Sequence, residues 1–302
     1  MTINTVVLFG AGASYGSNDV FPHATPLGAD LYTILKKNFP STWGNLPHDI
    51  DTKFQDNFEE GMKLVWENHS HNVGLLMRHL TLYFAQFRQN NPSQNLYFRF
   101  IESIKQNANE IAMSSLNYDV LLELAITSSG LQVNYFSDSP IQNSMLVWKL
   151  HGSCNFIPVN IHAGSGVSYG SGVSFNSNIQ AVSPNEAIQF CLSGTALYPA
   201  MCLYMDKKPT QISPSVIGKI QQNWLTSIGK ANKVLIIGVR PNPNDTHIWN
   251  PIIETNAMVG YIGSNEDFIK YVKQKRENKD TKFIGRRWNE AFDDSITFVS
   301  QN

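Results

Sequence analysis

The first residues that could do chemistry form a glycine-rich turn near the start of the chain. The apolar run at 6–9 leads directly into Gly10-Ala11-Gly12-Ala13-Ser14. A continuous apolar, β-branched run is typical of a buried parallel strand. Two glycines after such a strand permit a tight turn at which a diphosphate approaches the backbone, held by N–H groups of the next helix. The segment predicts the start of a nucleotide-binding α/β domain, and a turn that binds nothing is the alternative.

This turn departs from the pattern of classical dehydrogenases. A third glycine would stand at position 15, where the chain has Tyr15, and Gly16 follows one place late. Asp30 lies 20 positions after Gly10, where an acidic residue would bind ribose in those enzymes. The apolar spacing around Asp30 is helical, and no second strand precedes it. We therefore expect Asp30 to be an exposed helix residue.

Two further strands are predicted to end in polar side chains. Residues 111–115 are followed by Asn117 and Asp119, and residues 145–150 by His151 and Gly152. Parallel strands bring their carboxyl ends to one edge of a sheet, where ligands bind. Amide, carboxylate and imidazole groups together suit proton transfer and charge stabilisation. The alternatives are a helix cap for Asn117 and Asp119, and a structural role for His151.

Strands and helices alternate along most of the chain. The periodicity predicts helices at 27–35, 120–126, 214–229, 244–255 and 265–275, and strands at 133–136, 145–150, 234–238, 258–262 and 296–299. This alternation predicts a doubly wound, Rossmann-like parallel sheet in a single α/β domain over residues 1–302.

Three stretches depart from that alternation. Residues 40–57 have an irregular pattern and 58–107 a helical one, so 40–108 is predicted to be a helical insertion. Residues 163–178 hold four glycines and five serines, which predicts a flexible loop, either a mobile lid or plain disorder. Residues 179–213 are expected to be irregular.

The overall composition excludes several classes of protein. The 302 residues are 42% hydrophobic and 16% charged, as expected for a globular chain, and a net charge of −1 gives no basis for nucleic-acid binding through phosphates. No run approaches the ~20 apolar residues that span a bilayer, and no signal peptide is evident. Cys154, Cys191 and Cys202 have no metal-ligand spacing. We expect a reduced, cytoplasmic protein without a bound metal.

In their order along the chain, these motifs resemble the signature of the sirtuin superfamily. The glycine turn, residues 115–119 (SLNYD), residues 149–152 (KLHG) and the strand ending at Gly238 carry the resemblance. Residues 117–123 (NYDVLLE) and 25–28 (TPLG) are similar to the prokaryotic sirtuin-like branch of antiphage defence proteins, whose members consume NAD. Deacetylating sirtuins have a zinc ribbon with two CxxC pairs and an arginine in the loop corresponding to 21–26, and this chain has neither.

The resemblance implies catalytic roles for Asn117, Asp119 and His151. Asn117 would orient the ribose or the attacking water, Asp119 would hold the nicotinamide carboxamide, and His151 would act as a base. The residues expected to bind the cofactor are Gly10, Ala11, Gly12, Ala13, Ser14, Pro26, Gly238, Val239 and Arg240. For residues 244–247 (NDTH) we expect a helix cap, with a contact to adenosine as the alternative.

The function implied is that of an NAD glycohydrolase that depletes NAD in antiphage defence. NAD-dependent deacylation or ADP-ribosyl transfer is an alternative, and so is a module that senses NAD or ADP-ribose without turnover. NAD would be the substrate, and no metal is required. Because unregulated NAD loss is toxic, we expect a homo-oligomer or a protein partner. Partners in this branch include Ham1-like pyrophosphatases, HerA-like ATPases and Argonaute-like proteins. Direct nucleic-acid or membrane binding is not expected.

Overall fold

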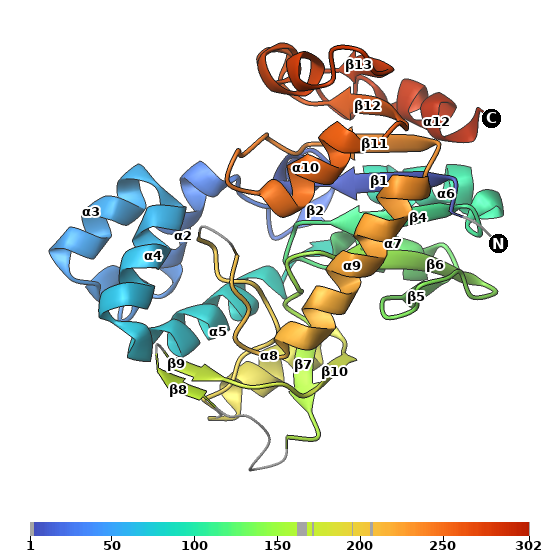
Figure 1. Ribbon diagram of the computed structural model, residues 1–302. Helices are drawn as coiled ribbons and strands as arrows, with labels where there is room; N and C mark the ends of the chain where they lie inside the picture. The colour runs from blue at the N-terminus through green and yellow to red at the C-terminus, as the bar shows by residue number, and fades with distance from the viewer. Residues whose placement is uncertain (1–2, 162–167, 171, 195, 206–207, 302) are drawn as a thin grey trace.

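Seven parallel strands form the central sheet of the molecule (Figure 1). The computed structural model describes residues 3–161, 168–170, 172–194, 196–205 and 208–301. The strands are β1 (Thr5–Phe9), β4 (Ile111–Ser115), β5 (Gln132–Asn134), β6 (Ser144–Lys149), β11 (Lys233–Ile237), β12 (Met258–Ile262) and β13 (Thr281–Gly285). Their order is β13-β12-β11-β1-β4-β6-β5, so the direction of chain progression reverses between β1 and β11. Ligands bind at such a switch point, outside the carboxyl ends of the strands.

Two groups of helices cover the sheet. The helices α9 (Pro214–Lys230) and α10 (Thr246–Glu254) pack together and lie in front of the sheet in Figure 1. The helix α6 (Leu96–Ile104) packs against α7 (Leu121–Ser128) and α12 (Phe292–Ser300) on the other side. Helices on both faces of a parallel sheet confirm the predicted doubly wound α/β class.

The stretch between β1 and β4 is mainly helical. It contains α1 (Ala11–Tyr15), α2 (Gly28–Asn38), α3 (His48–Asp56), α4 (Phe58–Asn68) and α5 (Val73–Phe84), short 3₁₀ turns, and the two-residue strands β2 (Val20–Phe21) and β3 (Arg88–Gln89), which pair. The predicted irregular stretch at 40–57 is wrong for α3, because Ile50 and Phe54 lie four residues apart and are both buried. Asp30 is exposed in the first turn of α2, as expected. The boundaries of the insertion at 40–108 stay a prediction.

Short antiparallel pairs and one helix follow β6. The strands β7 (Phe156–Val159) and β10 (Asn178–Ala181) pair, and β8 (Ser168–Gly170) pairs with β9 (Gly172–Ser174). Of the loop predicted at 163–178, residues 163–167 and 171 lie outside the described residues, and its flexibility stays a prediction. The region 179–213 contains α8 (Pro184–Leu192), which begins with a capping box between Ser183 and Glu186. The Ser-Pro-Asn-Glu pattern is a sequence signal for the start of a helix. The expectation of an irregular region is therefore wrong for α8.

The end of the chain differs from the prediction. Residues 296–299 belong to α12 and not to a strand, because Phe292, Ser295 and Val299 are buried at helical spacing. The last strand of the sheet is instead β13, an edge strand whose side chains are only partly buried. Before it, α11 (Asn265–Asp267) continues into the π-helix η5 (Phe268–Lys273).

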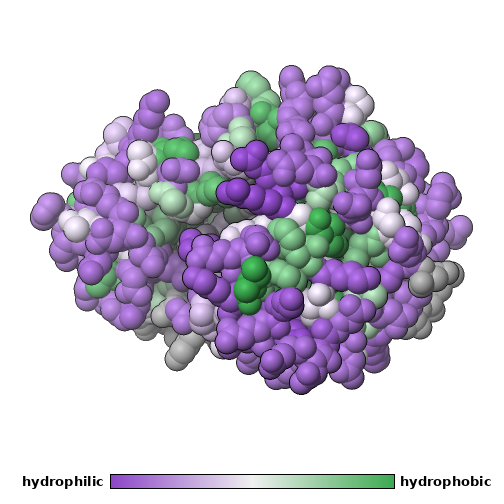
Figure 2. Space-filling model, turned by 90° about the horizontal axis from the view of Figure 1, so that it is seen from above, coloured by the Kyte–Doolittle hydropathy of each residue, from purple (hydrophilic) through white to green (hydrophobic). Residues whose placement is uncertain are grey.

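The face of the molecule seen in Figure 2 is largely hydrophilic. Figure 2 shows hydrophobic side chains only in small groups on the face seen from above. Within the described parts of the chain, no helix has the length and apolar character needed to cross a membrane.

The switch point is built on direct backbone contact between two turns. The Gly12 N–H donates to the Gly238 carbonyl at 2.9 Å, and the Gly10 N–H donates to the Ile237 carbonyl at 3.0 Å. A Cβ on Gly238 would lie 2.2 Å from the Ala13 nitrogen, and Gly238 has a φ of +66°. Both the close approach and the left-handed backbone require glycine at this position.

Replacing Gly238 therefore tests how much the fold depends on this approach. Gly238→Ala should lower the free energy of unfolding by about 3 kcal/mol, through left-handed strain plus overpacking. Gly130→Ala is the matched control, because Gly130 has a φ of +84° and no atom within 4 Å of an added Cβ. Urea unfolding of both variants measures the difference. Equal losses would contradict the packing account.

Candidate active site at the carboxyl edge of the sheet

The glycine turn presents little of its backbone to a ligand. The Gly12 N–H is bonded to Gly238, and the Ala13 N–H donates to the Gly10 carbonyl at 2.9 Å. Ala13 and Ser14 are buried, whereas Ala11 is exposed and Gly12 half-buried. Of the residues 10–14 predicted to bind diphosphate, Ala11 and Gly12 are therefore the ones that a ligand could reach without rearrangement.

The Ser14 hydroxyl connects three elements below this turn. Its oxygen lies 2.9 Å from Asn117 Nδ2 and 3.0 Å from the Tyr97 hydroxyl. A hydroxyl has one donor and two acceptor positions. Asn117 Nδ2 donates to it, either hydroxyl can supply the hydrogen of the contact with Tyr97, and Ser14 also lowers the pKa of the Asp119 carboxyl. The Ser14 hydroxyl holds the turn after β4 in place. The predicted contact between Ser14 and a diphosphate stays a prediction, and it would have to use an atom of Ser14 other than this hydroxyl.

Asn117 is oriented by the turn that follows β1. Its Nδ2 donates to the Gly10 carbonyl at 3.0 Å as well as to Ser14. Because a carbonyl can only accept, this contact fixes which atom of the amide is nitrogen. Asn117 Oδ1 is then the acceptor left for a ligand, and no hydrogen bond to it is present within the described residues. The side chain is half-buried at the edge of the sheet.

Asp119 is more deeply buried than a residue in direct contact with a ligand would be. It is 4% exposed, and its Oδ1 accepts from the Leu121 N–H at 3.1 Å at the start of α7. The bond joins Asp119 to the first residue of α7, although the N-cap position itself is Val120. Burial raises the pKa of Asp119, and the nearby Lys149 ammonium opposes that shift. The implied contact between Asp119 and nicotinamide stays a prediction.

A buried ion pair lies beside Asp119. Lys149 Nζ donates to the Asp119 carbonyl at 2.6 Å and lies 3.0 Å from Glu123 Oε1, with both side chains almost fully buried. Burial raises the pKa of Glu123 and Lys149 lowers it. The ion pair has no hydrogen-bond alignment, so both Glu123 oxygens lack a hydrogen bond within the described chain. Lys149 is thus paired with the Glu123 carboxylate and the Asp119 backbone, and its charge also lowers the pKa of the Asp119 carboxyl.

His151 follows β6 and comes to the same edge as Asn117. The backbone carbonyl of Leu116, the residue before Asn117, acts on its ring and raises its pKa in part. Gly152 then turns the chain with a φ of +73°, and a Cβ there would lie 2.0 Å from the Ala200 carbonyl oxygen. His151 is 6% exposed, and its carbonyl accepts from the Cys202 N–H at 2.8 Å. Burial, His247 and Lys208 hold the pKa of His151 well below its usual value.

His247 is a site residue whose role sequence reasoning missed. Its Nε2 lies 3.1 Å from His151 Nε2, although 96 positions separate the two residues. Burial, followed by the Lys208 charge, lowers the pKa of His247. The expected cap at 244–247 is wrong for Asp245, which occupies the N-cap position of α10 without a side-chain capping bond. The only signal in the sequence was a histidine in the first turn of the helix that follows β11.

Lys208 joins the helical stretch to this edge. Its ammonium pairs with Glu59 of α4 and lies 3.6 Å from Asp245 Oδ1 before α10. It also lies 5.0 Å from the centre of the Tyr204 ring. Lys208 is buried. Residues 200–205, the covering segment, contact His151 through the Cys202 N–H and Gly152 through Met201. The Lys208 charge adds to burial in lowering the pKa of both histidines.

The remaining predicted residues surround these groups less closely. Val239 is buried, and its carbonyl accepts from the Tyr261 hydroxyl at 2.9 Å. Arg240 is exposed and Pro26 half-buried. Two positions after Pro26, a Cβ on Gly28 would lie 3.2 Å from the Tyr204 hydroxyl, so the TPLG turn lies beside the covering segment.

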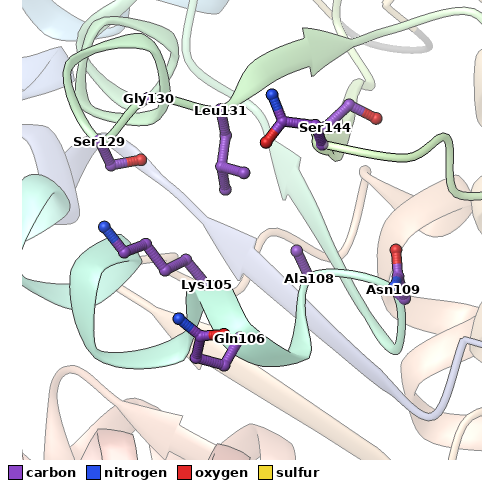
Figure 3. A pocket seen from close by; sticks show the side chains of 9 residues that line it. Lys105, Gln106, Ala108, Asn109, Ser129, Gly130, Leu131 and Ser144 are labelled. Atoms are coloured by element: carbon purple, nitrogen blue, oxygen red, sulfur yellow. The ribbon is translucent and has the colours of Figure 1, made fainter.

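Two cavities lie away from this edge. One of about 300 Å³ is lined by Lys105, Leu131 and Ser144 among others, at the amino ends of β5 and β6 (Figure 3). Another of about 590 Å³ lies between β10 and the start of α9. Neither is lined by a predicted site residue. Among the residues described, no three histidine, cysteine or acidic side chains are grouped to hold a metal ion.

Comparison with known proteins finds no sequence match and only low structural similarity. No family model and no curated protein sequence matches the chain. Solved structures with a similar arrangement include a Sir2 enzyme (TM-score 0.45, 11% identity, 99% of this chain and 92% of that one), a Sir2 homologue complexed with ADP-ribose (0.45, 12%, 98% and 91%) and a Sir2 homologue complexed with NAD (0.43, 14%, 98% and 89%). Scores this low do not establish a shared fold. The site therefore rests on the geometry of this chain.

The lowered pKa of His151 predicts how stability depends on pH. The native state keeps His151 neutral, whereas the unfolded chain binds a proton near pH 6.5. Stability from this residue is therefore complete above about pH 6.5 and is lost as the pH falls, by up to about 1.4 kcal/mol per pH unit. Urea unfolding between pH 7.5 and 5.5 should show a steeper loss for the wild type than for His151→Gln. If the free energy of unfolding falls equally with pH in both proteins, the burial of a neutral His151 imidazole is contradicted.

Proposed function

We propose that this chain is an NAD glycohydrolase, which cleaves NAD to nicotinamide and ADP-ribose at the switch point of the sheet. One observation carries the proposal: Asn117 bonds to the glycine turn, while the Leu150 N–H beside His151 donates to the Ser115 carbonyl at 3.0 Å, two positions before Asn117. An amide oxygen, an imidazole and a reachable glycine turn are thereby held at one edge. The sirtuin-like motif order supports NAD as the nucleotide, and the antiphage role is proposed on that resemblance.

The residues at this edge suit cleavage of the nicotinamide–ribose bond. Departure of nicotinamide leaves an oxocarbenium-like centre, so the reaction needs orientation and negative charge more than a strong nucleophile. Asn117 Oδ1 would accept from the attacking water or a ribose hydroxyl, and neutral His151 would receive the proton. The buried Asp119 and Glu123 carboxyls, of which Glu123 is paired with Lys149, would oppose the developing positive charge from below. Ala11 and Gly12 would meet the diphosphate.

ADP-ribosyl transfer or deacylation is the second candidate. The same bond is broken in these reactions, and a protein acceptor replaces water. The absence of the paired CxxC motifs from the sequence disfavours the deacylase. Adding an acyl-lysine peptide or a protein acceptor to the NAD assay separates the two, because hydrolysis yields free ADP-ribose whether or not an acceptor is present.

Variants of the two predicted catalytic residues test the assignment. His151→Ala should lower kcat by about 10²- to 10⁴-fold, the usual contribution of a general base. Asn117→Ala should lower kcat far more than it changes KM, because its role lies in transition-state geometry. Nicotinamide release gives the rates, and circular dichroism shows whether each variant folds. Normal turnover by folded His151→Ala, or a change in KM alone for Asn117→Ala, would contradict the proposed roles.

We also propose that the active form depends on a partner or on self-assembly. His151 is 6% exposed beneath residues 200–202 and α10, so substrate access requires these segments to move. A partner shifts such an equilibrium only by binding one state better than the other. A Ham1-like, HerA-like or Argonaute-like protein, or another copy of the chain, would supply that difference.

The regulated form is tested by comparing isolated and assembled protein. The monomer should release nicotinamide slowly, and the rate should rise by at least about tenfold, which is 1.4 kcal/mol of coupling, when co-purified partners and their trigger are added. Full-rate turnover by a monomer, unchanged by assembly, would contradict regulation and leave the NAD glycohydrolase itself intact.

A further inference from the structure

Two histidines face one another at the site, which restricts the nitrogens that can carry hydrogen. Their Nε2 atoms lie 3.1 Å apart, and a contact this short between two neutral rings requires one hydrogen between them. The Leu116 carbonyl raises the pKa of the His151 ring, and with Nε2 facing His247 we assign this contact to Nδ1. In that assignment neutral His151 has an unprotonated Nε2, and His247 carries the shared hydrogen on its own Nε2.

This arrangement leaves His247, and not His151, as the more accessible base. The His151 lone pair is occupied by the bond from His247, and its ring is buried. The His247 ring is only partly buried. Its Nδ1 is unprotonated in this tautomer, and no hydrogen bond to it is present in the described part of the chain. Lys208 keeps an added proton unfavourable on either ring in the absence of a negative partner.

We propose that His247 and His151 form a two-histidine proton relay in which His247 contacts the attacking water. This inference rests on the proposed NAD glycohydrolase function. The bond between C1′ and the nicotinamide nitrogen breaks, with its electron pair leaving on nicotinamide, and a water oxygen bonds to C1′. The water proton passes to His247 Nδ1 while the hydrogen on His247 Nε2 passes to His151 Nε2. His151 becomes an imidazolium, a form that the Leu116 carbonyl favours. The hydrogen then returns from His151 Nε2 to His247 Nε2 as His247 Nδ1 releases its proton to solvent.

The relay makes the two residues act as one unit, which a kinetic cycle measures. His247→Gln and His151→Gln should each lower kcat by about 10²- to 10⁴-fold with little change in KM, and the double variant should lose no more than either single one. Imidazole in the buffer should restore part of the activity of His247→Ala. His71→Gln, which alters an exposed histidine outside the site, is the control and should keep full activity.

Several outcomes would overturn the relay. A higher kcat for His247→Gln would show that His247 blocks access to His151. If the losses of kcat in the two single variants multiply in the double variant, the two residues act independently. A ¹⁵N NMR spectrum of the resting protein gives a readout without turnover. It should show hydrogen on His247 Nε2 and His151 Nδ1, with coupling between the two Nε2 atoms. The opposite tautomers would contradict the relay and leave the glycohydrolase proposal standing. Wild-type protein that forms this pair yet releases no nicotinamide, with or without partners, would overturn the proposed function and the relay with it.

Discussion

The hydroxyl of Ser14 is the interaction on which the candidate site depends. It accepts a hydrogen bond from Asn117 and shares one with the Tyr97 hydroxyl, so the turn after β1, the turn after β4 and helix α6 meet at one buried oxygen. Burial keeps the pKa of Tyr97 well above its usual value, so its phenol stays neutral. A small hydroxyl residue alone fits this role, because a larger side chain would separate the three elements and an alanine would leave buried donors unpaired.

The electrostatics of the site depend on two lysines with opposite effects. Lys149 lies below the sheet edge, pairs with Glu123 and lowers the pKa of Asp119, and both acidic residues are buried. Lys208 lies above it, shared by Glu59 and Asp245, and keeps the two imidazoles neutral. Removing one member of a buried ion pair typically costs about 3–5 kcal/mol, since the other charge stays uncompensated. The charge distribution is therefore coupled to the packing of α4, α7 and α10 around the same edge.

Local patterns predicted the sheet well, because buried parallel strands are continuous apolar runs. Residues 111–115 and 258–262 are strands with those bounds. The error at 296–299 arose because a short apolar run fits a strand and one helix face equally well, and β13 is a half-buried edge strand with a weak signal. The edge shared by Asn117 and His151 followed from parallel topology alone.

The rest of the site could not be predicted, because it depends on contacts distant in sequence. His247 meets His151 across 96 positions, and Lys208 meets Glu59 across 149. Ser14 was assigned to a ligand from its place in the turn, and only its buried partners show that its hydroxyl is used internally. Gly238 was assigned to the cofactor, yet its first requirement is the backbone of Gly12 and Ala13. The sequence motifs locate the edge of the sheet at which a ligand would bind, and tertiary packing determines which atoms face that ligand.

The most direct test of the central claim is a crystal structure of the protein with ADP-ribose. The account predicts the diphosphate beside Ala11 and Gly12, and the terminal ribose between Asn117 Oδ1 and His247, with residues 200–202 displaced to admit it. ADP-ribose bound instead in the cavity lined by Lys105 and Ser144, or between β10 and α9, would contradict a catalytic site at the switch point of the sheet.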